Sequence, residues 1–528
     1  MPQRTRRRGL RAPASMAALV LCLGLAAGAC DGGGRSLPGG FQEPPQPRPV
    51  LPETYRPTGR FAAGDAFVHL FQWTWANVAT ECEQHLGPAG WKAVQVSPPT
   101  EHVTGGAWWT VYQPVQYATS RSRSGTQAEF EDMIRRCRSA GVDVYVDIVL
   151  NHMSGGSGTG TNGTGYTKYN YPGLWTVADF HPPCGVSNYN DAANVQDCEL
   201  VGLADLNTGL ADVRRKLADL VVAFVRSGVA GFRIDAAKHV QPVELDSILV
   251  LAHRTLQAEG RALPYWFSEV IDYGTEAISG RDYYGLGYSS GGAQDITEFR
   301  FRGVGDRFTG ANGQRVSNLA QFSGPAWGLM PADKAVVFLE NHDTQRGGGI
   351  WYRDGAAFRL ANVWMLAQPY GYPVVLSGYA FDRATGAGRD GGPPHDATNP
   401  APVACAADYA IATPGQWTCE HRDPAIARMV RFRRASAGTD RRLDWHDNAN
   451  AVAFSRGTIG FVAINHNVTA LVQEIPSGLP AGTYCDVLTG GRVGAACAGT
   501  AVTVAADGRV SVNLGARSAV ALLVGDRL

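Results

Sequence analysis

Short β-rich runs alternate with amphipathic stretches through most of this chain, and the alternation limits the folds open to it. Apolar residues recur at helical spacing in the separating stretches, for example at 128–140 and 211–228. Strands that alternate with helices pair in parallel, and eight such units favour an α/β fold closed into a (β/α)8 TIM barrel over an open sheet. The runs expected to form the barrel strands are 66–73, 93–98, 142–150, 229–235, 265–270, 296–301, 335–340 and 372–378.

Three of these runs deliver a carboxylate where the apolar residues stop. Asp235 lies in GFRIDAAKH, Glu269 in YWFSEV and Asp343 in AVVFLENHD. In parallel barrels the chemistry lies at the carboxyl ends of the strands, so we expect the three acids to meet there. Hydrolysis of a glycoside needs a pair of acids flanking the sugar bond, one ionised and one keeping a proton near neutral pH.

The neighbours of two of these acids suggest how their roles divide. Arg233 precedes Asp235 by two residues, so on a strand both side chains project to the same side and the cation favours an ionised Asp235. An apolar setting, together with nearby carboxylates, is expected to raise the pKa of Glu269. The apolar residues next to Glu269 are Trp266, Phe267 and Val270.

Composition and charge exclude some classes of partner. The chain has 528 residues, of which 45% are hydrophobic and 18% charged, so a well-filled core is expected. Lys plus Arg is 47 and Asp plus Glu is 47, which gives a formal net charge of zero. Without a basic excess we expect no nucleic-acid partner, and a neutral polymer or small neutral ligand fits better.

The amino-terminal segment has the pattern of an export signal. Arginines precede the apolar stretch 16–27, and small residues at 27–29 provide a cleavage site, so residues 1–29 are predicted to be a signal peptide. Residues 30–60, rich in Gly and Pro, are predicted to form a flexible linker. The protein is expected to be exported, either secreted or anchored outside a bacterial membrane through a lipid on Cys30, which resembles a lipoprotein cysteine. Ordinary cleavage that leaves Cys30 as a free thiol is the alternative.

Ten cysteines agree with an oxidising destination. Cys22 lies in the signal and Cys30 follows the cleavage site. Eight others fall into pairs that are close in sequence, although spacing alone does not determine connectivity. The pairs we expect are Cys82 with Cys137, Cys184 with Cys198, Cys405 with Cys419, and Cys485 with Cys497.

Two further segments interrupt or follow the strand–helix pattern. Residues 153–204, after the third strand, are irregular and rich in Gly, Asn and Tyr, which predicts a small insertion domain. The barrel is therefore assigned to 61–152 and 205–430. Residues 431–528 alternate apolar and polar positions without a long helical pattern, which predicts a C-terminal antiparallel β-sandwich.

Six motifs in order resemble the conserved regions of the α-amylase family of glycoside hydrolases, nearest to its animal-type members. They are FVHLFQWTW, VQVSPP, DIVLNH, GFRIDAAKH, SEV and ENHD, and the likeness covers about residues 61–528. The resemblance implies that Asp235 is the nucleophile and Glu269 the general acid. It also implies that Asp343 binds sugar hydroxyls and holds the ring distorted.

The resemblance also implies a set of substrate contacts. Trp108, Trp109 and Tyr112 look like an aromatic platform for neighbouring glucose units, since the C–H face of a sugar is apolar. His152 and His342 resemble histidines that donate to sugar hydroxyls. The remaining positions assigned to substrate binding are Arg233, Lys238 and His239.

One structural calcium ion is implied, with oxygen ligands as this hard cation prefers. Asn151 and Asp205 match the family's side-chain ligands, whereas Gln196 and His239 match positions that contribute main-chain carbonyls. The ion would clamp the insertion onto the barrel. If Asn151 and Asp205 only cap turns, no ion is needed.

Chloride binding is not expected. Chloride-activated members of the family hold the anion with two arginines and an asparagine; Arg233 and Asn341 match two of these, but Val374 stands at the third position. Losing one of two cations should weaken anion binding substantially.

The sequence therefore predicts a retaining, endo-acting α-amylase that hydrolyses internal α-1,4 bonds of starch or glycogen, as a monomer. Within the family, the alternative is an α-glucan transglycosylase or an exo-acting, maltooligosaccharide-forming enzyme. From another class, the alternative is an inactive polysaccharide-binding barrel, which the complete set of Asp235, Glu269 and Asp343 argues against.

Overall fold

The computed structural model describes residues 64–284, 294–396 and 401–528. The predicted signal peptide, the linker and Cys30 lie outside the described residues. Among the helices that the structure does describe, none is long and apolar enough to cross a bilayer.

Eight parallel strands in the described part of the chain form a closed barrel, as predicted. Each strand is hydrogen-bonded to the next in the order β1-β2-β5-β10-β11-β12-β13-β14, and β14 closes back onto β1. The barrel strands are β1 (Phe67–Leu70), β2 (Ala93–Val96), β5 (Asp143–Val149), β10 (Gly231–Asp235), β11 (Tyr265–Ser268), β12 (Gln294–Thr297), β13 (Ala335–Val337) and β14 (Tyr372–Ser377).

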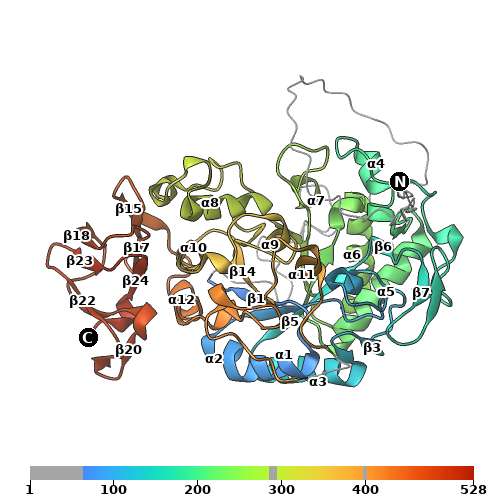
Figure 1. Cartoon of the computed structure of the whole chain (residues 1–528), viewed down its shortest axis with the longest axis horizontal. Coiled ribbons are helices and arrows are strands. Elements are labelled where there is room, and N and C mark those ends of the chain that lie inside the picture. Colours follow the sequence, from blue (N-terminus) through green and yellow to red (C-terminus); the bar gives the residue numbers. More distant parts are fainter. Residues whose placement is uncertain (1–63, 285–293, 397–400) are drawn as a thin grey trace, which may run out of the picture. The chain divides into compact units, whose positions relative to one another are not determined.

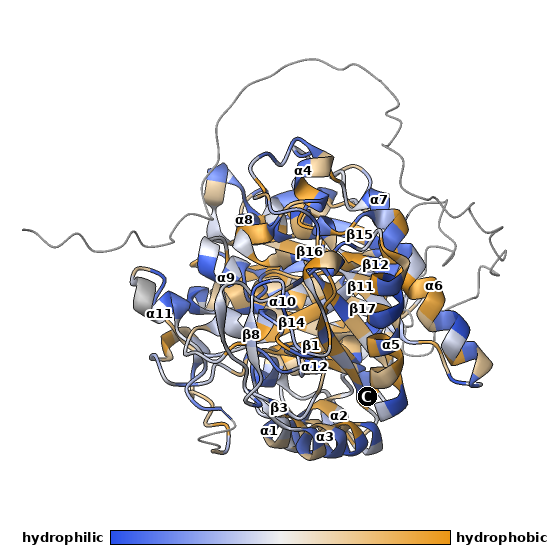
Figure 2. Cartoon of the chain, turned by 90° about the vertical axis from the view of Figure 1, so that its right-hand side faces the viewer, coloured by the Kyte–Doolittle hydropathy of each residue, from blue (hydrophilic) through white to orange (hydrophobic). Residues whose placement is uncertain are grey.

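The barrel interior is filled largely by aromatic side chains. The rings of Phe67 and Tyr372 lie 4.6 Å apart between centroids, and Tyr145 and Tyr265 lie 5.2 Å apart. Large rings pack closely between the strands, which favours a rigid frame for the residues at the strand ends. Figure 2 shows apolar strands enclosed by helices whose outer faces are hydrophilic. The interior cluster comprises Phe67, Ala93, Tyr145, Tyr265, Phe267, Val336 and Tyr372.

The sixth strand differs from its predicted range of 296–301. Strand β12 ends at Thr297, and Phe299–Arg302 form the 3-10 helix η6 instead. The side chain of Glu298 accepts hydrogen bonds from the main-chain N–H groups of Arg300 and Met330, which turns the chain out of the sheet. The prediction therefore placed the end of this strand too late, because it relied on the β-rich composition of residues 296–301.

Helices surround the barrel, and the two predicted amphipathic stretches form α3 and α5. A reciprocal capping box between Thr126 and Glu129 starts α3, and Gly228, with φ of 103°, ends α5. The α-helices are α1 (Trp75–Glu81), α2 (Gly87–Ala89), α3 (Gln127–Ser139), α4 (Ala192–Gln196), α5 (Ala211–Ser227), α6 (Pro242–Ala258), α7 (Arg281–Tyr284), α8 (Gly303–Thr309), α9 (Thr344–Gly347), α10 (Ala356–Ala367), α11 (Gly386–Asp390) and α12 (Pro424–Ala435).

The segment after the third barrel strand is an irregular excursion closed at its base. Strand β6 (His152–Met153) pairs with β9 (Ala204–Asp205), so the chain leaves and re-enters the barrel through one short antiparallel ladder. Within the excursion, β7 (Ser157–Thr159) pairs with β8 (Gly165–Thr167). Before it, the small hairpin β3 (Arg121–Ser122) and β4 (Gly125–Thr126) precedes α3.

The carboxyl-terminal part is the predicted antiparallel β-sandwich. Its two four-stranded sheets share one core, and the domain packs against α10, α12 and η8 (Val316–Gln321) of the barrel (Figure 1). The strands of the first sheet, in order, are β15 (Arg441–His446), β16 (Ala451–Arg456), β17 (Gly460–Asn465) and β24 (Ser518–Leu523). Those of the second are β18 (Leu471–Pro476), β23 (Arg509–Leu514), β22 (Ala501–Val504) and β19 (Gly482–Cys485), and β20 (Arg492–Val493) pairs with β21 (Ala496–Cys497).

All four predicted disulfides are present. They join Cys82 to Cys137, Cys184 to Cys198, Cys405 to Cys419, and Cys485 to Cys497.

A buried hydrogen-bond relay links the last barrel strand to the first helix. Ser377, which ends β14, lies 2.6 Å from Nδ1 of His421, and Nε2 of His421 lies 2.7 Å from Glu81 at the end of α1. Arg422 forms an ion pair with Glu81 as well. The relay therefore crosses the position where the barrel closes.

Candidate active site

The structure brings Asp235 and Glu269 together through one arginine. Nη1 of Arg233 lies 2.9 Å from Oδ1 of Asp235, and Nη2 of the same guanidinium forms an ion pair with Glu269. Because a guanidinium is small and planar, two carboxylates that contact it must lie near each other. The predicted strand-end gathering of these two acids is therefore present.

The main chain after Asp235 reinforces this arrangement. Ala236 has φ of 49°, a left-handed conformation that costs a non-glycine residue free energy and clusters at functional sites. In that conformation the N–H of Ala236 donates to Oε2 of Glu269 over 3.0 Å. Glu269 thus has polar partners, a cation and an N–H group. Phe267, two residues before Glu269, projects to the same side of the strand, whereas Trp266 projects to the other side, so part of the expected apolar setting faces Glu269.

A fourth carboxylate, Asp147, completes the cluster, and sequence reasoning missed it. Asp147 is fully buried in β5, pairs in register with Arg233, and accepts from Nη1 of Arg233 at 2.5 Å. It also accepts a hydrogen bond of 2.9 Å from the hydroxyl of Tyr112. A charged residue inside an otherwise apolar strand was the available signal, since buried charges need partners.

Burial makes it costly to ionise all of these acids at once. It raises the pKa of Asp235 well above its ordinary value; Arg233 lowers it, while Glu269 and Asp147 raise it further. Burial likewise raises the pKa of Asp147, and Arg233 opposes the change. With one guanidinium facing three acids, Arg233 only partly offsets burial and the mutual repulsion of the carboxylates, so the expected preference of Asp235 for its ionised form is outweighed.

Asp343, the third predicted acid, lies at the edge of the cluster and is the most exposed of the three, with 37% of its side chain accessible. Burial of the carboxyl group and the charge of Glu269 raise the pKa of Asp343 to about 7, and the cations Arg233 and Arg346 lower it. Nε2 of His342 lies 3.3 Å from Asp343. The imidazole of His342 is stacked on Tyr112 with ring centroids 5.2 Å apart and planes at 2°.

The aromatic residues predicted to contact substrate lie in one short segment. Trp108, Trp109 and Tyr112 belong to the 3-10 helix η2 (Trp108–Tyr112). Trp109 is 38% exposed, Trp108 is half-buried and Tyr112 is buried. Gln72 donates to the main-chain oxygen of Trp108 at 2.6 Å, and Arg123 holds the preceding loop.

His152 occupies both of its ring nitrogens within the protein. Nε2 donates to the main-chain oxygen of Tyr112 at 3.0 Å, so Nδ1 accepts from Nδ2 of Asn151 at 3.2 Å. Its geometry therefore positions Tyr112, and a bond to a sugar hydroxyl would require one of these partners to be exchanged.

Lys238 and His239 lie just beyond the nucleophile, in η5 (Ala237–His239). Lys238 forms an ion pair with Glu276, donates to the carbonyl of Ile271 at 2.7 Å, and lies 4.9 Å above the ring of Tyr189. Glu276 and Tyr189 were not predicted as neighbours of Lys238. Loops bring them there, and the sequence does not reveal the paths of those loops.

Arg346 is a further residue missed by sequence reasoning. This partly buried cation lies 4.5 Å from the Trp108 ring and 4.7 Å from the Phe381 ring, and it donates to the main-chain oxygen of His342. A second hydrogen bond, of 3.0 Å, reaches the carbonyl of Arg389. It therefore joins the aromatic platform to the loop that carries Asp343.

The four predicted calcium positions also converge. The carbonyl of Asn151 accepts from Leu206 at 2.9 Å, and His152 pairs in register with Asp205, so Asn151 and Asp205 are neighbours across β6 and β9. The ring of His239 contacts the carbonyl of Val195 at 2.9 Å, which brings η5 against the end of α4 at Gln196.

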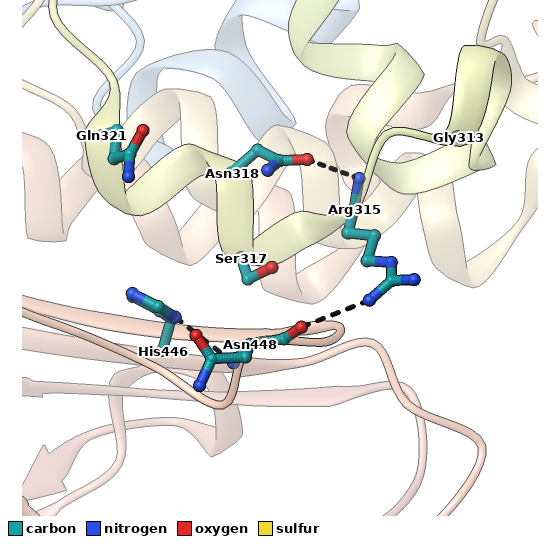
Figure 3. A pocket seen from close by; sticks show the side chains of 7 residues that line it. All are labelled: Gly313, Arg315, Ser317, Asn318, Gln321, His446 and Asn448. Atoms are coloured by element: carbon teal, nitrogen blue, oxygen red, sulfur yellow. Dashed lines mark hydrogen bonds between the residues drawn. The ribbon is translucent and has the colours of Figure 1, made fainter.

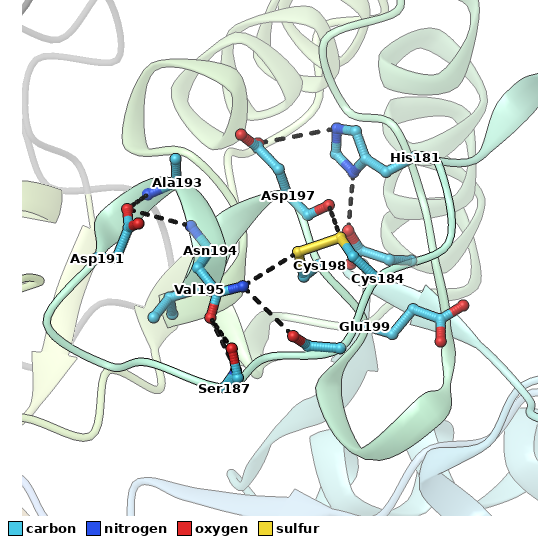
Figure 4. Close-up of a disulfide and its surroundings, with 12 residues drawn as sticks. His181, Cys184, Ser187, Asp191, Ala193, Asn194, Val195, Asp197, Cys198 and Glu199 are labelled. Atoms are coloured by element: carbon cyan, nitrogen blue, oxygen red, sulfur yellow. Dashed lines mark hydrogen bonds and ion pairs between the residues drawn. A yellow bond between two sulfur atoms is a disulfide. The ribbon is translucent and has the colours of Figure 1, made fainter.

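The donor atoms at this place fit a hard cation. Oδ1 of Asp205 is buried without a hydrogen-bond partner, and Nδ2 of Asn151 faces His152, which leaves Oδ1 of Asn151 for another contact. His181 contacts the other oxygen of Asp205 at 2.7 Å. Its second ring nitrogen, Nε2, lies 3.9 Å from Oδ1 of Asp197 (Figure 4). In the part of the chain that is described, no cluster of three or more His, Cys, Asp or Glu side chains is suited to a metal. A set made of one carboxylate, one amide and main-chain carbonyls would not form such a cluster.

Arg233, Asn341 and Val374 line one small cavity of about 20 Å³ inside the barrel. The three positions compared for chloride binding therefore do lie together. Only Arg233 supplies a cation among them, and its guanidinium is already shared by three carboxylates.

A closed parallel barrel that gathers acidic residues around one arginine at the carboxyl ends of its strands defines a glycoside hydrolase barrel. Comparisons with known proteins agree. The model described as "Alpha amylase, catalytic domain" matches residues 90–423, and "Alpha amylase, C-terminal all-beta domain" matches 444–525. The chain belongs to the α-amylase family.

Individual relatives cover most of the chain. An α-amylase of Tenebrio molitor is 43% identical over 470 residues, which are 86% of this chain and 96% of the relative. An α-amylase of Streptomyces violaceus is also 43% identical, over 87% of this chain and 74% of the relative. The solved structure of α-amylase I from Eisenia fetida superposes with a TM-score of 0.79 at 34% identity, covering 89% of this chain and 99% of that one. A glutamate-to-glutamine variant of that enzyme, solved with maltohexaose, gives the same TM-score.

Proposed function

We propose that this chain is a retaining, endo-acting α-amylase that hydrolyses internal α-1,4-glucosidic bonds of starch or glycogen. The observation that supports this most is the single guanidinium of Arg233 that contacts both Asp235 and Glu269. Retaining enzymes need their two carboxyl groups about 5–5.5 Å apart, whereas inverting enzymes hold them farther apart to admit a water. Two acids on one planar cation favour the closer, retaining arrangement.

In this mechanism Asp235 attacks the anomeric carbon and forms a covalent glycosyl-enzyme. Glu269 gives its proton to the leaving glycosidic oxygen, then removes a proton from the water that releases the sugar. Asp343 accepts hydrogen bonds from hydroxyls of the ring being cleaved, and its partial exposure leaves it open to substrate. Arg233 limits the repulsion between Asp235 and Glu269 when both are ionised.

The aromatic wall would hold the chain of glucose units. Trp108 and Trp109 offer ring faces to the apolar side of sugars, and Tyr112 with His342 lines the position next to the acids. Burial, with help from Arg233, lowers the pKa of His342 well below its ordinary value. A neutral His342 can exchange hydrogen bonds with hydroxyls without adding charge. The maltohexaose complex of the Eisenia fetida relative supports an α-glucan as the ligand class.

We also propose one calcium ion held by side-chain oxygens of Asn151 and Asp205 and by main-chain carbonyls of Gln196 and His239. Its charge would neutralise the partnerless oxygen of Asp205 and tie the insertion to the barrel. Four disulfides agree with export to an oxidising compartment. We further propose that the exported protein is a monomer. It is either secreted or anchored to the outside of a bacterial membrane through a lipid on Cys30.

The direct test is the early product pattern on soluble starch. Endo attack yields a mixture of oligosaccharides from the first minutes, one dominant product would favour the exo-acting alternative, and longer products made from maltohexaose would favour a transglycosylase. Replacing Glu269→Gln should lower kcat by about 10²–10⁴-fold, because cleavage of the glycosidic bond then lacks its proton donor.

Glu276→Gln serves as the control, since it removes a nearby carboxylate that contacts Lys238 and not Asp235. Starch hydrolysis that is unchanged in Glu269→Gln would contradict the assignment of the acid. No hydrolysis by the wild-type protein would favour the inactive polysaccharide-binding barrel.

A further inference from the structure

A polar groove lies between the barrel and the C-terminal domain, away from the carboxylate cluster. We call it the seam groove; its volume is about 350 Å³ (Figure 3). On one side it is bordered by η8 and the loop before it, and on the other by the end of β15 and the turn that follows. The lining residues are Gly313, Arg315, Ser317, Asn318, Gln321, His446 and Asn448.

The two sides of the seam groove are fixed against each other by hydrogen bonds from both main-chain and side-chain groups. The N–H of Ser317 donates to the carbonyl of Ala449 at 3.1 Å, and the N–H of Val316 donates to Oδ1 of Asn450 at 3.3 Å. Arg441 donates to the carbonyl of Leu319 at 2.8 Å. A groove held in this way keeps its shape before a ligand arrives, which lowers the entropic cost of binding.

Several hydrogen-bonding groups in the seam groove have no partner within the described residues. The amide of Gln321 and the hydroxyl of Ser317 make none of the hydrogen bonds found there, and Asn318 uses Oδ1 for the N–H of Arg315, which leaves its Nδ2. His446 accepts from the N–H of Asn448 through Nδ1, which leaves Nε2. Figure 3 shows these groups bordering one hollow.

The chemistry of this lining selects a neutral, hydroxyl-rich ligand. Amides and hydroxyls both donate and accept, as vicinal sugar hydroxyls do, whereas an apolar ligand would leave them unsatisfied. Arg315 is the one residue with a permanent charge among the seven lining residues, and it donates to the carbonyl of Asn448 at 3.5 Å, so most of the lining is neutral. The volume is within the range of about 300–1,000 Å³ typical of small-ligand sites.

The seam groove is separate from the place of hydrolysis. Arg441, which holds η8, also contacts Gln368 at 3.4 Å, and Gln368 precedes β14 at the amino end of that strand. The acids lie at the opposite, carboxyl ends. None of the lining residues belongs to the acid cluster or to its aromatic wall.

We propose that the seam groove is a second binding site for an α-glucan segment, which anchors a polymer while another part of it is cleaved. The proposal rests on the α-glucan specificity inferred above. A weak second site adds to the binding of a long chain through effective concentration, whereas a short oligosaccharide that cannot span both sites gains nothing. Altering the groove should therefore weaken the binding of a long α-glucan, whereas the binding of a short oligosaccharide should not change.

The test uses Ser317→Ala combined with Gln321→Ala in the full-length enzyme. Neither side chain makes a hydrogen bond within the described residues, so the fold should be retained. We expect kcat/KM for maltohexaose to stay within about twofold of wild type. Retardation by glycogen in native gels, measured with Glu269→Gln present to prevent digestion, should weaken about fivefold, as expected for two lost hydrogen bonds.

The matched control is Gln473→Ala with Asn513→Ala, two exposed polar residues on β18 and β23 outside the groove. Equal glycogen retardation of both double variants and wild type would overturn the proposal. So would protection of 313–321 from hydrogen exchange by inorganic phosphate but not by maltohexaose, which would indicate an anion site. Loss of maltohexaose hydrolysis by the wild type would instead count against the proposed function.

Discussion

Arg346 shows how one partly buried side chain can serve two parts of a site. It has no carboxylate partner among the described ion pairs; instead it contacts aromatic rings and main-chain oxygens, including that of His342 next to Asp343. Its charge also lowers the pKa of Asp343, which burial raises. We therefore regard Arg346 as a positioning residue with an electrostatic effect on Asp343.

Replacing Arg346→Gln should lower kcat/KM on the order of 10²-fold, because Trp108 and Asp343 lose their common anchor. Without the cation the pKa of Asp343 rises further, so less of it is ionised at a given pH and the acid limb of the rate profile moves to higher pH. Arg346→Lys keeps the positive charge, so the acid limb of its rate profile should lie at the same pH as in the wild type. Its rate should stay below that of the wild type. A rate loss with an unmoved acid limb would assign Arg346 a purely structural role.

Val374 leads to an expectation about anions. It faces the same small cavity as Arg233 and Asn341, and a valine there replaces a cation with an apolar side chain. Starch hydrolysis by chloride-free enzyme should therefore change less than about twofold when chloride is added, with nitrate as the control for ionic strength. Strong activation by chloride would show that Arg233 and Asn341 suffice.

At the scale of elements, the relay from β14 to α1 stabilises barrel closure. Burial raises the pKa of Glu81, but hydrogen bonds from His421 and Arg422 outweigh it and bring the value to about 2. Because the folded pKa is depressed, the contribution of Glu81 to stability is present above about pH 4.5 and is lost as pH falls through about 2.

Replacing Glu81→Gln should cost about 3 kcal/mol of unfolding free energy at pH 7, since one partner of a buried pair is removed. The difference from wild type should shrink as pH falls from 4.5 toward 2, as the wild-type carboxylate itself becomes protonated. Urea unfolding at several pH values measures this, with the exposed Glu131→Gln as control. A pH-independent difference would contradict the role of the ionised carboxylate.

At the scale of the whole molecule, the insertion meets the barrel at the short β6–β9 ladder and at the contact between α4 and η5. A ligand that binds only the folded state stabilises it by about 2.7 kcal/mol at a hundredfold excess over its Kd. Chelation by EGTA should therefore lower Tm, and added calcium should restore it. Asp205→Asn should reduce the response, whereas Asp191→Asn, at the start of α4, should not. An unchanged Tm would contradict the calcium proposal.

Much of the fold could be predicted because its signals are local. Strand and helix periodicity, the acids where apolar runs stop, and cysteines close in sequence can each be recognised within short segments, and the barrel, the sandwich and the disulfides are confirmed. The end of β12 was misjudged because the hydrogen bond from Met330 to Glu298 comes from a distant loop.

By itself, the sequence determined which acids end the barrel strands. Only the tertiary structure decided that Asp147 shares Arg233 with them, that Arg346 connects Trp108 to the Asp343 loop, and that η8 borders a groove with the C-terminal domain. The physical reason is that these contacts depend on strand register and loop paths between segments far apart in the chain, which local propensity does not encode.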